Sequence, residues 1–139
     1  FWIFHNTGFI RFFQYYKNDW SLPRKVWWTQ YISTPLLLSF APVSSQKNIE
    51  FLKWLGVEIP SETERYLQGR PGSMIERSLD VAIEVLNDTL RSITEKNLKV
   101  PIGLNVEHIM SYNFQSSVEM LQELARIYRE FCIKSKQYS

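Results

Sequence analysis

The sequence lacks the features that most quickly assign a chain to a class of protein. It has no run of about 18 apolar residues, the length needed to cross a bilayer, and its longest apolar clusters, such as residues 35–40, are strand-sized. Its one cysteine, Cys132, excludes an internal disulfide and is typical of a reducing intracellular compartment, mitochondrial or cytoplasmic. With 16 basic against 14 acidic side chains, the net charge of +2 gives no electrostatic reason to expect a nucleic-acid partner.

Short motifs that carry chemistry are also scarce. The chain has no paired-cysteine metal motif and no Gly-x-Ser-x-Gly elbow, and the glycines at 69–72 follow a predicted helix, which excludes a phosphate loop. His5, at the end of a predicted strand, is a candidate for ligand binding or proton transfer, but a hydrogen-bonded structural histidine is the commoner case. Cys132, beside Phe131 and Ile133, is most simply a partly buried small hydrophobe.

What the sequence does contain is typical of a globular protein. Hydrophobic residues make up 45% and charged residues 22%. Of the 21 aromatic residues, 11 lie within residues 1–28, more than the core of a chain this short can bury. This concentration indicates either a large core that continues beyond the chain or an interface with a partner, where aromatic residues are enriched.

Hydrophobic periodicity and turn residues predict alternating strands and helices. The predicted strands are residues 1–5, 36–41 and 102–107. The predicted helices are residues 9–17 and 23–32, one that begins after Ser44 or Ser45 and ends at Gly56, one opened by a capping box at 61–64, one opened by a capping box at 73–76, and 114–134.

Strands that alternate with helices are usually parallel and joined by helical crossovers. We therefore expect an α/β fold, a partial (β/α)8 TIM barrel made of its last three strand–helix units, with the three strands as parallel neighbours in chain order. A complete barrel takes about 250 residues. The rest is then expected to come from an N-terminal half or a neighbouring subunit, with residues 1–32 buried against it.

The stretch PLLLSFAPVSSQKNIEFLKWLGVEIP, at 35–60, resembles the seventh strand and following helix of methylenetetrahydrofolate reductases. VPIGLNVE at 100–107 is similar to the eighth strand of that family, and residues 1–18 match the sixth more loosely. The resemblance implies that residues 1–139 are the C-terminal segment of such a barrel, strands six to eight.

In that family the barrel holds FAD and passes a hydride between a nicotinamide, the flavin and a folate. Most flavin contacts come from the first five strands, so we do not expect this chain alone to bind FAD tightly. On the folate side, Asn48 aligns with a family glutamine and Leu52 with a phenylalanine. Trp2 and Ile109 stand near a second glutamine and an arginine of the family, so at least two polar folate contacts are absent.

Asn105 and Glu107 are the candidate site residues that the sequence itself indicates. They are two apart on a predicted strand, so they point the same way. They also stand at its C-terminal end, the face where barrel enzymes bind substrates. A carboxylate and an amide there can hold a ligand, or they can form a polar cluster that closes the barrel mouth. The candidate substrate-binding residues are therefore Asn48, Leu52, Asn105 and Glu107.

Two functions follow from the resemblance. The chain can be part of a flavin-dependent methylenetetrahydrofolate reductase of folate one-carbon metabolism, incomplete or degenerate and without catalytic activity by itself. Alternatively, a reductase-like barrel has become a non-catalytic accessory subunit of a large multi-protein assembly. No metal site is expected in either case. Intact flavin contacts in the missing part of the barrel would favour the enzyme.

Overall fold

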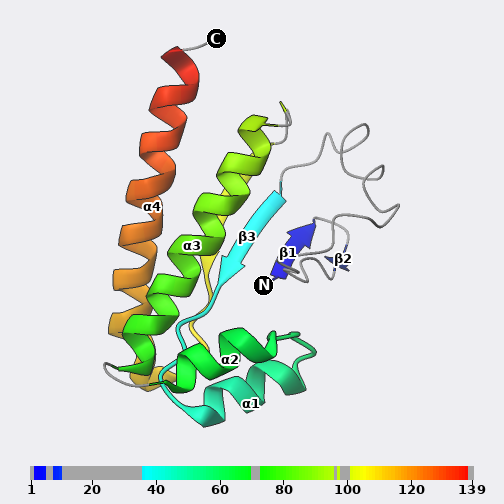
Figure 1. Cartoon of the computed structure of the whole chain (residues 1–139), viewed down its shortest axis with the longest axis vertical. Coiled ribbons are helices and arrows are strands. Elements are labelled where there is room, and N and C mark those ends of the chain that lie inside the picture. The colour runs from blue at the N-terminus through cyan, green and yellow to red at the C-terminus, as the bar shows by residue number, and fades with distance from the viewer. Residues whose placement is uncertain are drawn as a thin grey trace.

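The computed structural model describes residues 2–5, 8–10, 36–69, 73–95, 97 and 101–137. In chain order the elements are β1 (Trp2–His5), β2 (Gly8–Ile10), β3 (Leu36–Phe40), α1 (Gln46–Trp54), α2 (Ser61–Gln68), α3 (Met74–Glu95), β4 (Ile102–Val106), a short 3-10 helix (Ser111–Asn113) and α4 (Phe114–Gln137). The described part of the chain is mostly helical. The long helices α3 and α4 lie side by side, while α1 and α2 lie where β3 ends (Figure 1).

The four strands form one mixed sheet in the order β2-β1-β3-β4. Only β3 and β4 are parallel, and β1 pairs antiparallel with both β2 and β3. The predicted order of β1, β3 and β4 is therefore confirmed, but the prediction of three parallel strands is wrong. The expected partial TIM barrel of three strand–helix units is likewise contradicted, because a barrel of that kind requires every strand to run in the same direction.

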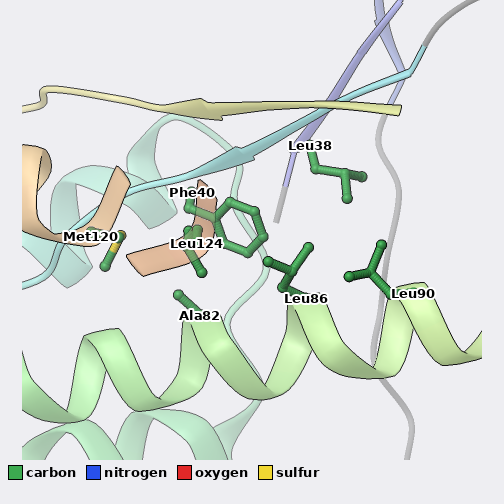
Figure 2. Packing of buried hydrophobic residues seen from close by; sticks show 7 residues of the cluster. All are labelled: Leu38, Phe40, Ala82, Leu86, Leu90, Met120 and Leu124. Carbon is green, nitrogen blue, oxygen red and sulfur yellow. The ribbon is translucent and has the colours of Figure 1, made fainter. Parts of the chain in front are cut away.

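The main core lies between the parallel strands and the two long helices (Figure 2). Leu38 and Phe40 of β3 point from one face of the sheet toward α3 and α4, and alternate residues of β4 pack against the same cluster. The buried members of this core are Leu38, Phe40, Ala82, Leu86, Leu90, Met120 and Leu124. A continuous apolar strand such as β3 is typical of a strand covered by helices.

Helix α3 follows the predicted pattern closely. Ser73 and Glu76 form the expected capping box: the Glu76 backbone N–H donates to Ser73 Oγ at 3.2 Å, and the Ser73 N–H donates to Glu76 Oε2 at 2.9 Å. Ala82, Leu86 and Leu90 are then buried at spacings of four residues. This stripe fixes the helix against the sheet.

Helices α1 and α2 form a second, smaller core at one end of the sheet, made of Val43, Ile49, Leu52, Val57 and Leu67. Gly56 ends α1 as predicted, with a φ of 85°, and the N–H of Val57 donates to the Leu52 carbonyl in a Schellman motif. The capping box predicted at 61–64 is not formed, because Pro60 takes the N-cap position and Ser61 already lies inside α2.

Two other predictions need correction. Residues 8–10 form the strand β2, whereas a helix was predicted from residue 9, and residues 11–35, including the helix predicted at 23–32, lie outside the described residues. In α4, Leu124, Ile127, Tyr128 and Phe131 pack in the core as predicted, but the buried face differs from the predicted one at three positions, 114, 120 and 121. Met120 and Leu124 are buried, whereas Phe114 and Leu121 are exposed.

The expected burial of residues 1–32 against other protein also falls outside the side chains that the structure describes. None of the described helices has the length and apolar character needed to cross a membrane.

The core between sheet and helices leads to a first prediction. Leu86 is 0% exposed, whereas Leu121, also on a long helix, is 43% exposed. Leu86→Ala is expected to lower the free energy of unfolding by about 2–5 kcal/mol, because it leaves a cavity. Leu121→Ala, the matched control, is expected to change it by about 0.5 kcal/mol or less. Urea denaturation followed by circular dichroism measures both, and equal losses would contradict the packing described.

Candidate functional site

The candidate site lies at the carboxyl ends of β3 and β4. Because the two strands are parallel and paired from Leu36–Ile102 to Phe40–Val106, both end at the same edge of the sheet. The Glu107 N–H then donates to the Phe40 carbonyl at 2.7 Å, which extends the pairing beyond the strands. In open α/β sheets, ligands bind outside the carboxyl ends of parallel strands.

One polar group lies on the sheet face that points away from α3 and α4. Ser39 pairs in register with Asn105, whose Nδ2 donates to Ser39 Oγ at 3.2 Å. The same Nδ2 donates to Glu107 Oε1 at 2.5 Å, which confirms that these two side chains point the same way. We refer to Ser39, Asn105 and Glu107 as the sheet-face cluster.

Among the residues that the structure describes, no partner occupies some of the hydrogen-bond acceptors of the sheet-face cluster. Both amide hydrogens of Asn105 are directed to Ser39 and Glu107, so its Oδ1 is left to accept a bond. Of the two Glu107 oxygens, only Oε1 has a hydrogen-bond partner among the described residues. Both side chains are half-buried. The cluster therefore presents adjacent acceptors, one of them a carboxylate, to a ligand that carries N–H donors.

An apolar surface adjoins the cluster. Leu37 pairs in register with Gly103. This pair comes two residues before the pair Ser39–Asn105, so it lies on the same face of the sheet. A Cβ atom added at Gly103 would approach Leu37 Cδ1 to 3.0 Å, so Leu37 lies against the glycine. Leu37 is itself partly exposed on this face. The face therefore combines an apolar contact with acceptors, the usual composition of a small-molecule site.

A second polar group joins the loop after β3 to the turn after β4, and we call it the loop network. Asn48 Oδ1 accepts the Ser44 backbone N–H at 3.0 Å, and the Ser44 hydroxyl lies 2.9 Å from Asn113 Oδ1. Asn113 Nδ2 lies 3.5 Å from the Pro42 carbonyl and 3.4 Å from Asn48 Oδ1. Asn48 Nδ2 donates to the Tyr112 hydroxyl oxygen at 3.1 Å.

The loop network holds the two loops together. Its amides are buried, and a buried polar group without partners would cost about 1–3 kcal/mol. The Val43 N–H also donates to Ser78 Oγ of α3 at 2.9 Å, which fixes the loop after β3 against the helix. The network is therefore chiefly structural and sets the position of the sheet edge beside it.

Tyr112 is the exposed end of this network, with 65% of its surface accessible. The N–H of Asn48 is the main cause that lowers the pKa of Tyr112 below its usual range, and the Ser45 hydroxyl contributes. The Ser45 hydroxyl is buried and makes no hydrogen bond of good geometry, although it lies near enough to Tyr112 for this effect. Tyr112 is thus polarised by donors directed at its oxygen.

The structure separates the predicted site residues. Asn105 and Glu107 lie together on the sheet face that points away from α3 and α4, whereas Asn48 is 0% and Leu52 8% exposed, inside the loop network and the smaller core. His5 ends β1, which is antiparallel to β3, so its backbone lies at the opposite edge from Glu107, contrary to the expected catalytic face. The functional roles of Asn48, Leu52, Asn105 and Glu107 stay predictions.

Sequence reasoning missed Ser44, Tyr112 and Asn113. The sequence signal for these residues is a pair of polar segments. Ser-Tyr-Asn at 111–113 follows β4, and Ser44 and Ser45 follow β3. Polar loops after two paired parallel strands meet at one edge, so the run could have been paired with the loop after β3. The missing information was which side chains of the two loops meet.

Other parts of the described chain offer less chemistry. No group of three or more histidine, cysteine or acidic side chains there is arranged to hold a metal ion. A groove of about 250 Å³ lies between α3 and α4, lined in part by Leu90, Arg91 and Phe131. It is formed by the C-terminal halves of both helices, toward the far end of the sheet from the candidate site (Figure 1).

No protein-family model matches the chain, and no curated protein matches it in sequence. Among solved structures, its fold is similar to that of an uncharacterized protein from Clostridium thermocellum that binds two copies of 5-methyl-5,6,7,8-tetrahydrofolic acid. The TM-score is 0.54 and the sequences are 26% identical over 67% of this chain and 32% of that protein. This chain thus spans about a third of the length of its structural neighbour.

The loop network leads to a second prediction, which concerns two exposed tyrosines. Asn48 lowers the pKa of Tyr112, whereas a hydrogen bond to the Asp80 carboxylate raises that of Tyr66. Tyr112 is therefore expected to ionise at a lower pH than Tyr66. Ultraviolet absorbance titrations of Tyr112→Phe and Tyr66→Phe, each subtracted from that of the wild type, isolate the two curves. The network would be contradicted if the Tyr66 curve came first.

Proposed function

We propose that this chain binds a reduced folate through the sheet-face cluster, with the pterin ring held by Asn105 and Glu107. The observation that carries the proposal is the pair of acceptors on these residues, at the carboxyl end of β4, that have no partner in the described part of the chain. The similarity to a structure whose description names a bound methyltetrahydrofolate supports the same ligand class.

The chemistry of a reduced pterin fits these acceptors. Its 2-amino-4-oxopyrimidine edge carries the ring N3–H and the exocyclic amino group as adjacent donors. A carboxylate can accept both, and charge-assisted hydrogen bonds of this kind are stronger than neutral ones. Glu107 Oε2 and Asn105 Oδ1 are the acceptors available in the cluster. The pterin would lie with its apolar surface against Leu37, which adjoins the cluster.

The proposal concerns the ligand that this chain binds rather than a reaction that it catalyses. The resemblance of residues 35–60 to methylenetetrahydrofolate reductases supports a place in one-carbon metabolism, and we propose that this chain supplies a folate contact to such an activity. We propose also that it does not bind FAD tightly by itself, because the family's flavin contacts come from earlier strands. The ligand can be held without any redox step on this chain.

A non-catalytic accessory subunit is the second candidate. Asn48 and Leu52, which the resemblance aligns with folate contacts, are buried among this chain's own residues. A reductase-like segment that has lost its ligand would keep such residues for packing alone. In that case the sheet-face cluster would be covered by protein, and no folate would bind.

Binding of 5-methyltetrahydrofolate to the wild type and to Glu107→Gln tests the proposal. Glutamine keeps the size of the side chain but replaces one acceptor by a donor and removes the charge. The dissociation constant is expected to rise roughly 10- to 100-fold, the effect of losing a charged hydrogen bond. Calorimetry under anaerobic conditions measures it.

Glu119→Gln is the matched control, because Glu119 lies on α4 and its carboxylate bonds only Gln115 among the described residues. It is expected to leave binding unchanged. A parallel titration with FAD is expected to give no submicromolar binding. The proposal would be refuted if the wild type did not bind the folate, or if Glu107→Gln bound it equally well. The accessory subunit would then be the remaining candidate function.

A further inference from the structure

Hydrogen-bond directions in the loop network determine where the Tyr112 proton points. The Ser44 backbone N–H can only donate, so the side-chain atom of Asn48 that it meets must be Oδ1. The amide nitrogen of Asn48 is then the atom 3.1 Å from the Tyr112 oxygen. Tyr112 therefore accepts this bond, and its own hydroxyl hydrogen is left for another acceptor.

The exposed position of Tyr112 makes that hydrogen accessible to an acceptor outside the network. Tyr112 is largely exposed, and among the described residues its hydroxyl is not the donor of any hydrogen bond. Tyr112 belongs to the turn that follows β4, five positions after Glu107, at the same edge of the sheet. The buried Asn48 amide donates to the hydroxyl oxygen, so the hydroxyl can still donate its own hydrogen to a ligand.

A positive charge stands beside this donor. Lys47 is exposed in the first turn of α1, next to Asn48, and is close enough to act on Tyr112 electrostatically. The first turn of α1 contains no acidic residue that would offset this charge. A hydroxyl donor near an ammonium group is suited to an anion, above all a carboxylate.

We infer that Tyr112 and Lys47 form an anion subsite that binds a carboxylate of the folate's glutamate tail. The inference rests on the proposed folate binding at Asn105 and Glu107. In a reduced folate the tail leaves the pterin from the side opposite the amino-pyrimidine edge. A pterin bound by its edge to Glu107 therefore directs its tail away from the sheet-face cluster. The subsite would hold the tail at the rim, where water still reaches it.

The experiment compares two ligands on the full chain. One is 5-methyltetrahydrofolate, and the other is a 5-methyltetrahydropterin that lacks the p-aminobenzoylglutamate tail. Tyr112→Phe removes the hydroxyl donor, together with the acceptor of the Asn48 bond, and is expected to weaken the binding of 5-methyltetrahydrofolate roughly three- to ten-fold. Lys47→Gln is expected to weaken it by about two- to five-fold, an effect that shrinks in high salt. Neither variant should change the affinity for the tail-less pterin.

Tyr66→Phe is the control, because Tyr66 is also exposed and bonded through its hydroxyl, but to Asp80, between α2 and α3. It is expected to bind both ligands as the wild type does. The inference is overturned if Tyr112→Phe and Lys47→Gln both bind 5-methyltetrahydrofolate within twofold of the wild type, or if they weaken both ligands equally. In either case wild-type binding would still support the proposed function. If the wild type binds neither ligand, both proposals fail.

Discussion

The parallel pairing of β3 with β4 is the constraint on which the rest of the structure depends. It brings two strands that are more than sixty residues apart in the sequence into register from Leu36–Ile102 to Phe40–Val106. One face of this pair is buried by α3 and α4 (Figure 2). The other face carries the sheet-face cluster, and the loops beyond the strands meet in the loop network. Without this pairing Ser39 would not face Asn105, and the acceptors on Glu107 would not be fixed in place.

Much of the fold could be predicted because the local signals were strong. The capping box at Ser73 and the apolar stripe of α3 are determined by residues within a few turns of one another. The direction of β1 could not be predicted, since a four-residue apolar strand has no feature that distinguishes a parallel from an antiparallel neighbour. The expectation of a barrel therefore failed at its first strand. In α4, apolar residues occur on more than one face, so periodicity alone could not choose between Leu121 and Met120.

Only the part of the candidate site that lies on a single strand could be predicted from the sequence. Asn105 and Glu107 are two residues apart, so strand geometry alone puts them on one face. Asn48 was singled out through a resemblance, and the structure gives it another use, because its amide fixes the loop after β3 and orients Tyr112. That role depends on a contact between residues more than sixty positions apart. The expected pairing of β3 with β4 brings the two loops to one edge, but it does not determine that Tyr112 contacts Asn48, which depends on the path of each loop.

A crystal structure of the chain with 5-methyltetrahydrofolate tests folate binding at the sheet-face cluster most directly. We expect electron density for the pterin on the sheet face, with its amino-pyrimidine edge within about 3 Å of the Glu107 carboxylate, the usual length of such hydrogen bonds. We also expect the Asn105 amide to keep its bond to Ser39. Density for the ligand in the groove between α3 and α4, or a sheet face covered by another part of the chain with no ligand bound, would contradict folate binding at this cluster.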